Sequence, residues 1–144
     1  MPRNAVVWTL MVSAVAVHVA DEALTGFLPF YNEQVLTLRE RFAFFPAPTF
    51  SFSVWLGGLA VAVAAGVAMI PAIARGSRVV RATCGVLSVL MIANACGHLL
   101  GSVYAGRLLP GFWSAPWLLA MSVWMLRRVI NGDWRRRTDM ARER

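Results

Sequence analysis

Long runs of apolar residues, separated by short polar or glycine-containing segments, dominate the chain. Four of these runs have about the 20 residues that a helix needs to cross the hydrocarbon core of a bilayer. They extend from Ala5 to about Leu28, from Phe50 to Ala74, from Ala82 to Tyr104 and from Phe112 to Ile130. The pattern predicts an all-α fold, a four-helix transmembrane bundle over residues 1–130, followed by a basic cytoplasmic tail over residues 131–144.

The connection between the first two runs, residues 29–49, has a helical pattern of its own. Its polar and apolar positions recur on opposite sides of a helix. The polar positions are Glu33, Thr37, Glu40 and Arg41, and the apolar ones are Val35, Leu38, Phe42 and Phe45. We therefore expect an interfacial amphipathic helix between spans one and two, ended by Pro46 and Pro48. Two interpretations remain open: the helix covers a cavity between the spans, or it is only a linker.

The composition agrees with lipid as the solvent. Hydrophobic residues make up 58% of the chain and charged residues only 15%, too few to cover a water-exposed surface. The two cysteines, Cys84 and Cys96, lie on one predicted helix. The standard helical rise separates them by about 18 Å, so they cannot form a disulfide with each other.

The positive charge indicates topology rather than nucleic-acid binding. The net charge is +7, all 14 basic residues are Arg, and half of them lie in residues 127–144. Arg75, Arg78 and Arg81 crowd the connection between spans two and three, whereas charges cancel in the long outer connection. The positive-inside rule then predicts a multi-pass protein of the bacterial inner membrane with both termini in the cytoplasm. No nucleic-acid recognition motif accompanies the charge, so we expect a lipid surface as its partner.

A cleaved signal peptide is the main rival to the first span. Arg3 precedes an apolar run, and Ala14-Val15-Ala16 resembles a cleavage site. The apolar run resumes from Ala23 to Phe30, which makes it longer than a signal-peptide core. We therefore favour a span.

Ionisable side chains inside the apolar runs need a partner or a function, because each is costly in lipid. The first run contains His18, Asp21 and Glu22, and the third contains Asn94 and His98. Spacings of three and four residues place each group on one side of its helix. Both helices are expected to run outward from the cytoplasm, and at the standard rise both groups lie about 18–26 Å from the inner ends of their helices. Because lipid cannot satisfy polar groups, we expect the two groups to meet, with Glu22 within hydrogen-bonding reach of His98.

These residues also carry a family resemblance. The three segments concerned are His18-Val19-Ala20-Asp21-Glu22, Asn94-Ala95-Cys96-Gly97-His98 and Pro110-Gly111. In this order they resemble the motifs H-x-x-E-E, N-x-x-x-H and Y-x-P-G of the HXXEE-motif family of bacterial integral membrane proteins, over about residues 10–125. The resemblance implies a site but no reaction, since the function of that family is undefined.

The chain departs from the family pattern at two positions. Asp21 replaces the first Glu, which keeps the carboxylate but shortens its reach. Leu108 stands where the family has Tyr, so a phenol is missing unless Tyr104 supplies it.

The five polar residues suit several functions. We favour a membrane enzyme that needs no cofactor, in which His18, Asp21, Glu22, Asn94 and His98 form an acid–base site. Burial disfavours the charged forms and pairing favours them, so a proton donor and acceptor can coexist. Such a site suits isomerisation, cyclisation or hydrolysis of a hydrophobic small molecule.

Three alternatives remain. His18, Glu22 and His98 are a plausible ligand set for zinc or iron, although Asn is a poor ligand and the ligand count is only just sufficient. The cluster is otherwise a structural clasp in which Asn94 and His98 bond to Glu22. A transporter is disfavoured, since the spans show no inverted repeat, although a homo-oligomer would be able to build a pathway.

Overall fold

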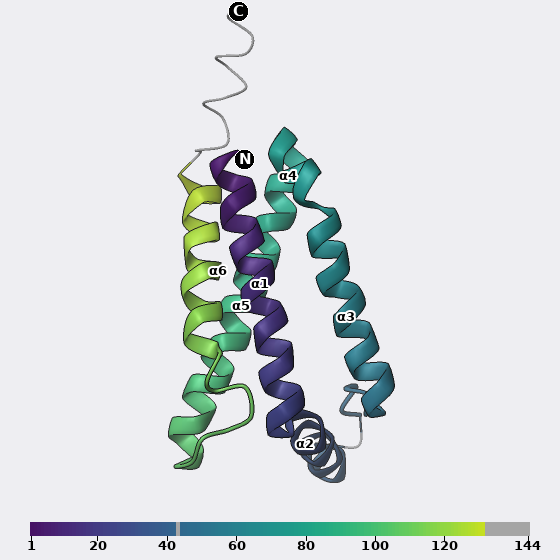
Figure 1. Cartoon of the computed structure of the whole chain (residues 1–144). Helices are drawn as coiled ribbons and strands as arrows, with labels where there is room; N and C mark the ends of the chain where they lie inside the picture. The colour runs from purple at the N-terminus through teal and green to yellow at the C-terminus, as the bar shows by residue number, and fades with distance from the viewer. Residues whose placement is uncertain (43, 132–144) are drawn as a thin grey trace, which may run out of the picture.

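The computed structural model describes residues 1–42 and 44–131, and this part of the chain contains helices and connections but no strand. The helices are α1 (Arg3–Thr25), α2 (Phe27–Arg41), α3 (Phe52–Ala68), α4 (Ile70–Arg75), α5 (Arg78–Ala105) and α6 (Ala115–Ile130) (Figure 1). The predicted all-α class is confirmed. The predicted basic tail lies, apart from Asn131, outside the described residues.

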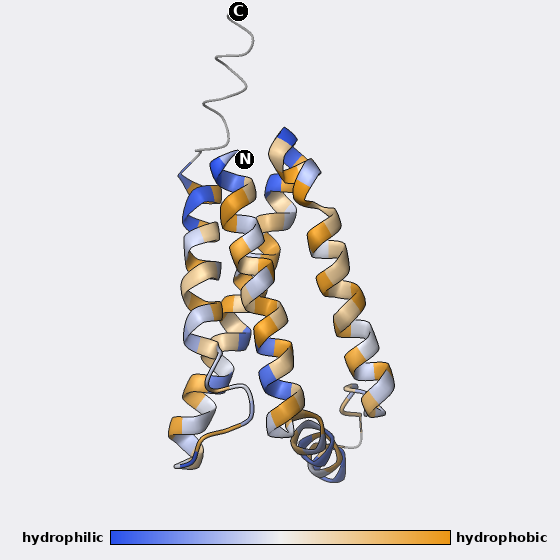
Figure 2. Ribbon diagram, viewed as in Figure 1, coloured by the Kyte–Doolittle hydropathy of each residue, from blue (hydrophilic) through white to orange (hydrophobic). Residues whose placement is uncertain are grey.

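Three helical segments are long and apolar enough to cross a membrane: α1, α3 together with α4, and α5. Figure 2 shows apolar residues along most of their length. Three of the four predicted spans are thus confirmed at this level. The fourth predicted span corresponds to α6, whose 16 residues extend over only about 24 Å.

The first span ends earlier than predicted. Gly26 adopts a left-handed conformation with φ of 82°, and its N–H bonds to the carbonyl of Glu22, which ends α1 at Thr25 rather than near Leu28. The chain then turns into α2, so the apolar residues after Gly26 belong to a different helix. Among these residues Leu28, in the first turn of α2, is buried.

The helix between spans one and two is confirmed, although it begins at Phe27 and ends at Arg41, before the prolines. Val35 is buried and the four predicted polar positions are exposed. The prediction that Phe42 and Phe45 lie on the apolar side of the helix is wrong, because both follow its end and Phe42 is exposed. The following connection is tied back to α2, because the side chain of Asn32 donates to the Phe50 carbonyl and accepts from the Phe50 N–H.

Helix α1 occupies the middle of the fold. It packs against α2, α3, α4 and α6, and α6 also packs along α5 (Figure 1). Near its start, Trp8 and Met11 join Ile73, Cys84 and Met125 in a buried apolar cluster. The indole Nε1–H of Trp8 donates to the carbonyl of Gly66 at 2.7 Å, which fastens α1 to α3.

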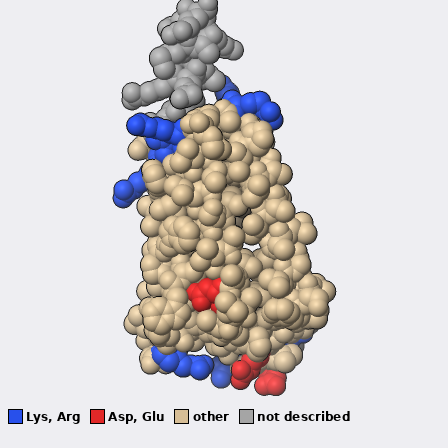
Figure 3. All heavy atoms as spheres, viewed as in Figure 1, with Lys and Arg blue, Asp and Glu red and all other residues tan. Residues whose placement is uncertain are grey.

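The start of α1, the α4–α5 connection and the end of α6 lie at one end of the molecule, and α2 lies at the other (Figure 1). The Nε–H of Arg128 donates to Asn4 Oδ1 at 2.9 Å and joins α6 to α1 there. Figure 3 shows Arg side chains at both ends and a nearly uncharged flank between them, interrupted by an acidic group. This is the charge distribution expected of a membrane-embedded bundle.

Candidate functional site

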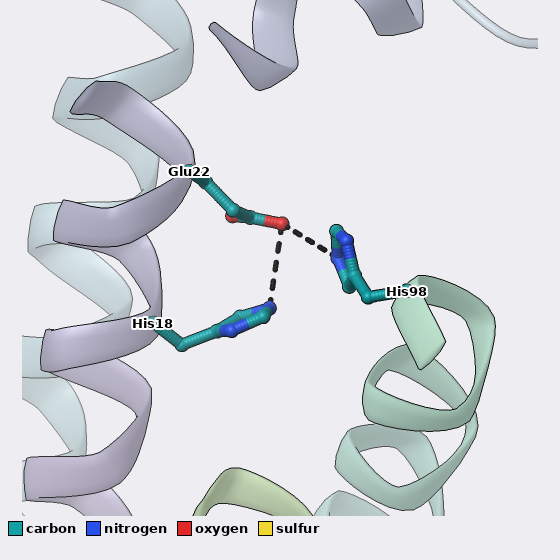
Figure 4. A group of neighbouring side chains, drawn as sticks. All are labelled: His18, Glu22 and His98. Atoms are coloured by element: carbon teal, nitrogen blue, oxygen red, sulfur yellow. Dashed lines mark ion pairs between the residues drawn. The ribbon is translucent and has the colours of Figure 1, made fainter. Parts of the chain in front are cut away.

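One carboxylate and two imidazoles meet between α1 and α5. His18 and Glu22 come from successive turns of α1 and His98 comes from α5, and all three are buried. Glu22 Oε1 lies 3.0 Å from His98 Nε2 and 3.5 Å from His18 Nε2 (Figure 4). The two rings meet edge to face, with centroids 4.8 Å apart. The predicted approach of Glu22 to His98 is confirmed, and we call these three residues the histidine–glutamate cluster.

The connection between α5 and α6 fixes the orientation of His98 through a hydrogen bond to the ring nitrogen Nδ1. Its Nδ1 lies 2.6 Å from the carbonyl oxygen of Pro110. Because a carbonyl can only accept, the Nδ1 of His98 must carry a proton and donate it. In a neutral ring, Nε2 then holds a lone pair, and this lone pair faces Glu22.

The orientation of His18 follows from a similar chain of hydrogen bonds. The hydroxyl of Ser114 donates to Asp21 Oδ2 at 2.7 Å, and the Ser114 Oγ itself lies 2.7 Å from His18 Nδ1. Since the single hydroxyl proton is used in the bond to the carboxylate, Ser114 Oγ accepts from the Nδ1–H of His18. In a neutral ring the buried Nε2 of His18 therefore also presents a lone pair towards Glu22, and it has no hydrogen-bond partner among the described residues.

The Asp21 carboxylate is not part of the histidine–glutamate cluster. It supports His18 through the hydroxyl of Ser114. Its Oδ2 also accepts from the backbone N–H of Ser114 at 2.9 Å, at the start of α6. One turn later, Thr25 Oγ1 accepts from the N–H of Gly111 at 3.2 Å. The end of α1 thus holds the 106–114 connection, which in turn orients both imidazoles.

Asn94 lies outside the histidine–glutamate cluster. It lines a cavity of about 250 Å³ together with His98, and its buried Oδ1 has no hydrogen-bond partner among the described residues. No hydrogen bond joins the Asn94 amide to the Glu22 carboxylate within the described residues, so the Asn94 half of the predicted clasp is absent. Phe27 and Phe30, in the first turn of α2, also line this cavity.

Sequence reasoning assigned no role to two residues that shape the site. Gly111 has φ of 83°, and a Cβ atom there would lie 2.8 Å from both Cε1 and Nδ1 of His98. Ser114 links Asp21 to His18. Ser114 was detectable as a helix-start residue, because it stands two positions before Pro116 at the first turn of α6. The family resemblance singled out Gly111 as part of the Pro110-Gly111 segment, but no spacing in the sequence predicted its contact with His98.

A family model described as a protein of unknown function with HXXEE motif matches residues 9–125. The chain belongs to this family. No curated protein and no solved structure matches the chain.

The structure locates the family motifs of this chain in one place. His18, Asp21 and Glu22 supply the first motif, Asn94 and His98 the second, and the Pro110-Gly111 segment touches His98 from behind. Tyr104 does not replace the missing phenol, since its side chain is 96% exposed.

Proposed function

We propose that this protein is a membrane-embedded enzyme that acts on a hydrophobic small molecule, with a zinc or ferrous ion held by His18, Glu22 and His98. The observation that carries the proposal is the convergence of three electron-pair donors on one point. Both Nδ1–H groups are engaged elsewhere, so in the neutral rings both Nε2 atoms turn lone pairs towards the carboxylate of Glu22.

Lone pairs at such distances repel unless a cation or a proton lies between them. The possible ligand atoms of the three residues all lie within 4.8 Å of one another. A tetrahedral zinc with bonds of about 2.0–2.1 Å separates its ligand atoms by about 3.3 Å. The contacts of Glu22 Oε1, at 3.0 and 3.5 Å, bracket that separation.

The groups that hydrogen-bond to the Nδ1 atoms of His18 and His98 also fit a metal site. Imidazoles that bind metals donate their other N–H to a carbonyl or to a hydrogen-bonded carboxylate, which fixes the tautomer. Pro110 plays this part for His98, and Ser114 with Asp21 plays it for His18. Two His and one carboxylate leave coordination positions open, as in catalytic rather than structural sites. A metal so held would polarise a substrate oxygen or activate water, which suits isomerisation, cyclisation or hydrolysis.

A metal-free acid–base enzyme is the second candidate. It is favoured by the 3.0 Å separation of Glu22 Oε1 from His98 Nε2, which is a hydrogen-bond distance if the pair holds one proton. That proton would pass between the pair and the substrate and carry the same classes of reaction. The two candidates use the same atoms and differ in what occupies the space between them.

The membrane arrangement is part of the proposal. We infer that α6 is the fourth span of a transmembrane bundle, in a bacterial inner membrane, with both termini in the cytoplasm. Its support is that Arg75, Arg78 and Arg81 border the end of the molecule where α1 begins and α6 ends. The bilayer is then the route by which a hydrophobic substrate arrives.

Metal analysis of the purified protein decides between the candidates. Protein extracted without chelator should carry about one zinc or iron per chain, and His18→Ala, Glu22→Gln and His98→Ala should each lose it. Glu33→Gln is the matched control, since Glu33 is an exposed carboxylate of α2. Wild-type protein that is active and free of metal would refute the metal-dependent function and leave the acid–base function.

A further inference from the structure

The cavity beside His98 has mostly apolar walls, and apart from the imidazole of His98 its polar side chain is the amide of Asn94. Phe27 and Phe30 contribute aromatic faces from α2, Leu109 an aliphatic one, and Gly97 a stretch of open backbone. None of the residues that line it is Arg, Asp or Glu. Its volume of about 250 Å³ exceeds the roughly 150 Å³ of an apolar cavity that takes up benzene.

The polar side chain of this cavity has an unused acceptor. The amide Oδ1 of Asn94 is buried and has no hydrogen-bond partner within the described part of the chain. Buried acceptors are satisfied in nearly all native proteins, and an exception calls for a partner that the chain itself does not provide. Asn94 lies one helical turn before His98, so a donor bound to Asn94 lies close to the histidine–glutamate cluster.

We propose that this cavity is the substrate site and that Asn94 recognises a neutral hydrogen-bond donor, a hydroxyl group, on an otherwise lipophilic substrate. The inference rests on the proposed function, because that function makes the histidine–glutamate cluster beside the cavity the reactive site. A cationic head is disfavoured because the lining offers no carboxylate, and an anionic one because it offers no Arg. A hydroxyl needs only an acceptor, and Asn94 Oδ1 is the acceptor left open.

The position of the hydroxyl next to His98 gives it a part in the chemistry. Phe27 packs against the His98 ring at 5.4 Å, so the apolar body of the substrate would extend from the imidazole along the aromatic wall. The reacting end would then be the hydroxyl-bearing end. Asn94 acts as a specificity residue in this arrangement, because it selects the end that enters.

Photolabelling with a matched pair of probes tests this inference without turnover. The probes are octan-1-ol carrying a diazirine ring and the methyl ether of the same molecule, each added to the detergent-solubilised full chain. The alcohol should label the peptides of α2 and α5 that line the cavity about fivefold more strongly than the ether, the effect of one net hydrogen bond. Asn94→Leu should abolish this preference, because Leu has the same branched heavy-atom skeleton as Asn and no acceptor.

Two further variants serve as controls. Gly97→Leu should block both probes, since the Cβ position of Gly97 has no neighbour within 4 Å and a side chain there is free to project into the cavity. Thr83→Val removes a polar group of α5 that bonds only to its own helix, and it should leave the preference unchanged. Equal labelling by alcohol and ether in wild type, or a preference that survives Asn94→Leu, overturns the inference.

This experiment separates the inference from the proposed function. A preference that depends on Asn94 in protein without metal would support the substrate site while the metal-dependent function fails. Stoichiometric metal without any preference for the alcohol would leave the function standing and refute the substrate site.

Discussion

Gly111 lies against His98 so closely that a Cβ atom at position 111 would stand 2.8 Å from the Nδ1 of the imidazole and 3.2 Å from Cγ of Glu22. The glycine is thus required twice, once for its φ of 83° and once for its lack of a side chain. It belongs to the Pro-Gly motif of the family, and its place in the structure gives that motif a physical meaning. Pro110 provides the carbonyl that orients His98, and Gly111 provides the room for the ring.

The substitution Gly111→Ala should therefore damage the site more than the fold. Gly106→Ala is the matched control, because Gly106 also has a positive φ, 63°, but nothing lies within 4 Å of its Cβ position. Both variants should lose about 1–2 kcal/mol of stability from the left-handed backbone. Only Gly111→Ala should also displace His98 and release the metal, as measured by thermal unfolding and metal analysis of the same samples. Equal metal content in the two variants would contradict the assigned role of Gly111.

Asp21 is expected to be a positioning residue. The substitution Asp21→Asn keeps an acceptor for Ser114 but removes the charge that draws the hydroxyl proton away from His18. Metal affinity should fall by about 10–100-fold, the usual effect of altering a group that supports a ligand. Competition with a chromophoric chelator measures this affinity. A merely structural role would lower the melting temperature and leave the affinity of the folded protein unchanged.

Glu22→Gln distinguishes a catalytic cluster from a clasp. Gln has the shape of Glu and its amide N–H can donate to the Nε2 of either imidazole, so the contact between α1 and α5 should persist. We expect a stability within about 1 kcal/mol of wild type, the size of one net hydrogen bond, together with loss of metal and turnover. Full turnover in this variant would exclude Glu22 from the reaction. Unchanged metal content would exclude it as a ligand.

Topology is testable by cysteine accessibility in intact cells, in a background without Cys84 and Cys96. Thr37→Cys lies on the exposed side of α2 and should react with a membrane-impermeant reagent from outside. Pro2→Cys and Arg144→Cys should react only after permeabilisation, because four spans return the chain to the side where it began. Labelling of Arg144→Cys but not Pro2→Cys in intact cells would mean that α6 does not cross.

The sequence by itself determined the helical class, three membrane-length segments and the meeting of Glu22 with His98. These conclusions follow from strong constraints, since lipid demands long apolar helices and leaves buried ionisable groups only one another as partners. The boundary near Leu28 was wrong because hydropathy does not detect a turn between two apolar segments. Gly26 ended the helix through its left-handed conformation.

Only the tertiary structure divided the five polar residues into different tasks. At 100° per residue, Asp21 and Glu22 point 100° apart on α1, so only one of them can face His98. Glu22 faces it, and Asp21 reaches Ser114 instead. Asn94 and His98 both line the cavity, but Asn94 lies about 6 Å away along α5, and only His98 reaches Glu22. Helical spacing fixes which side chains share a broad face, whereas the rotation of each helix against its neighbours decides which of them touch.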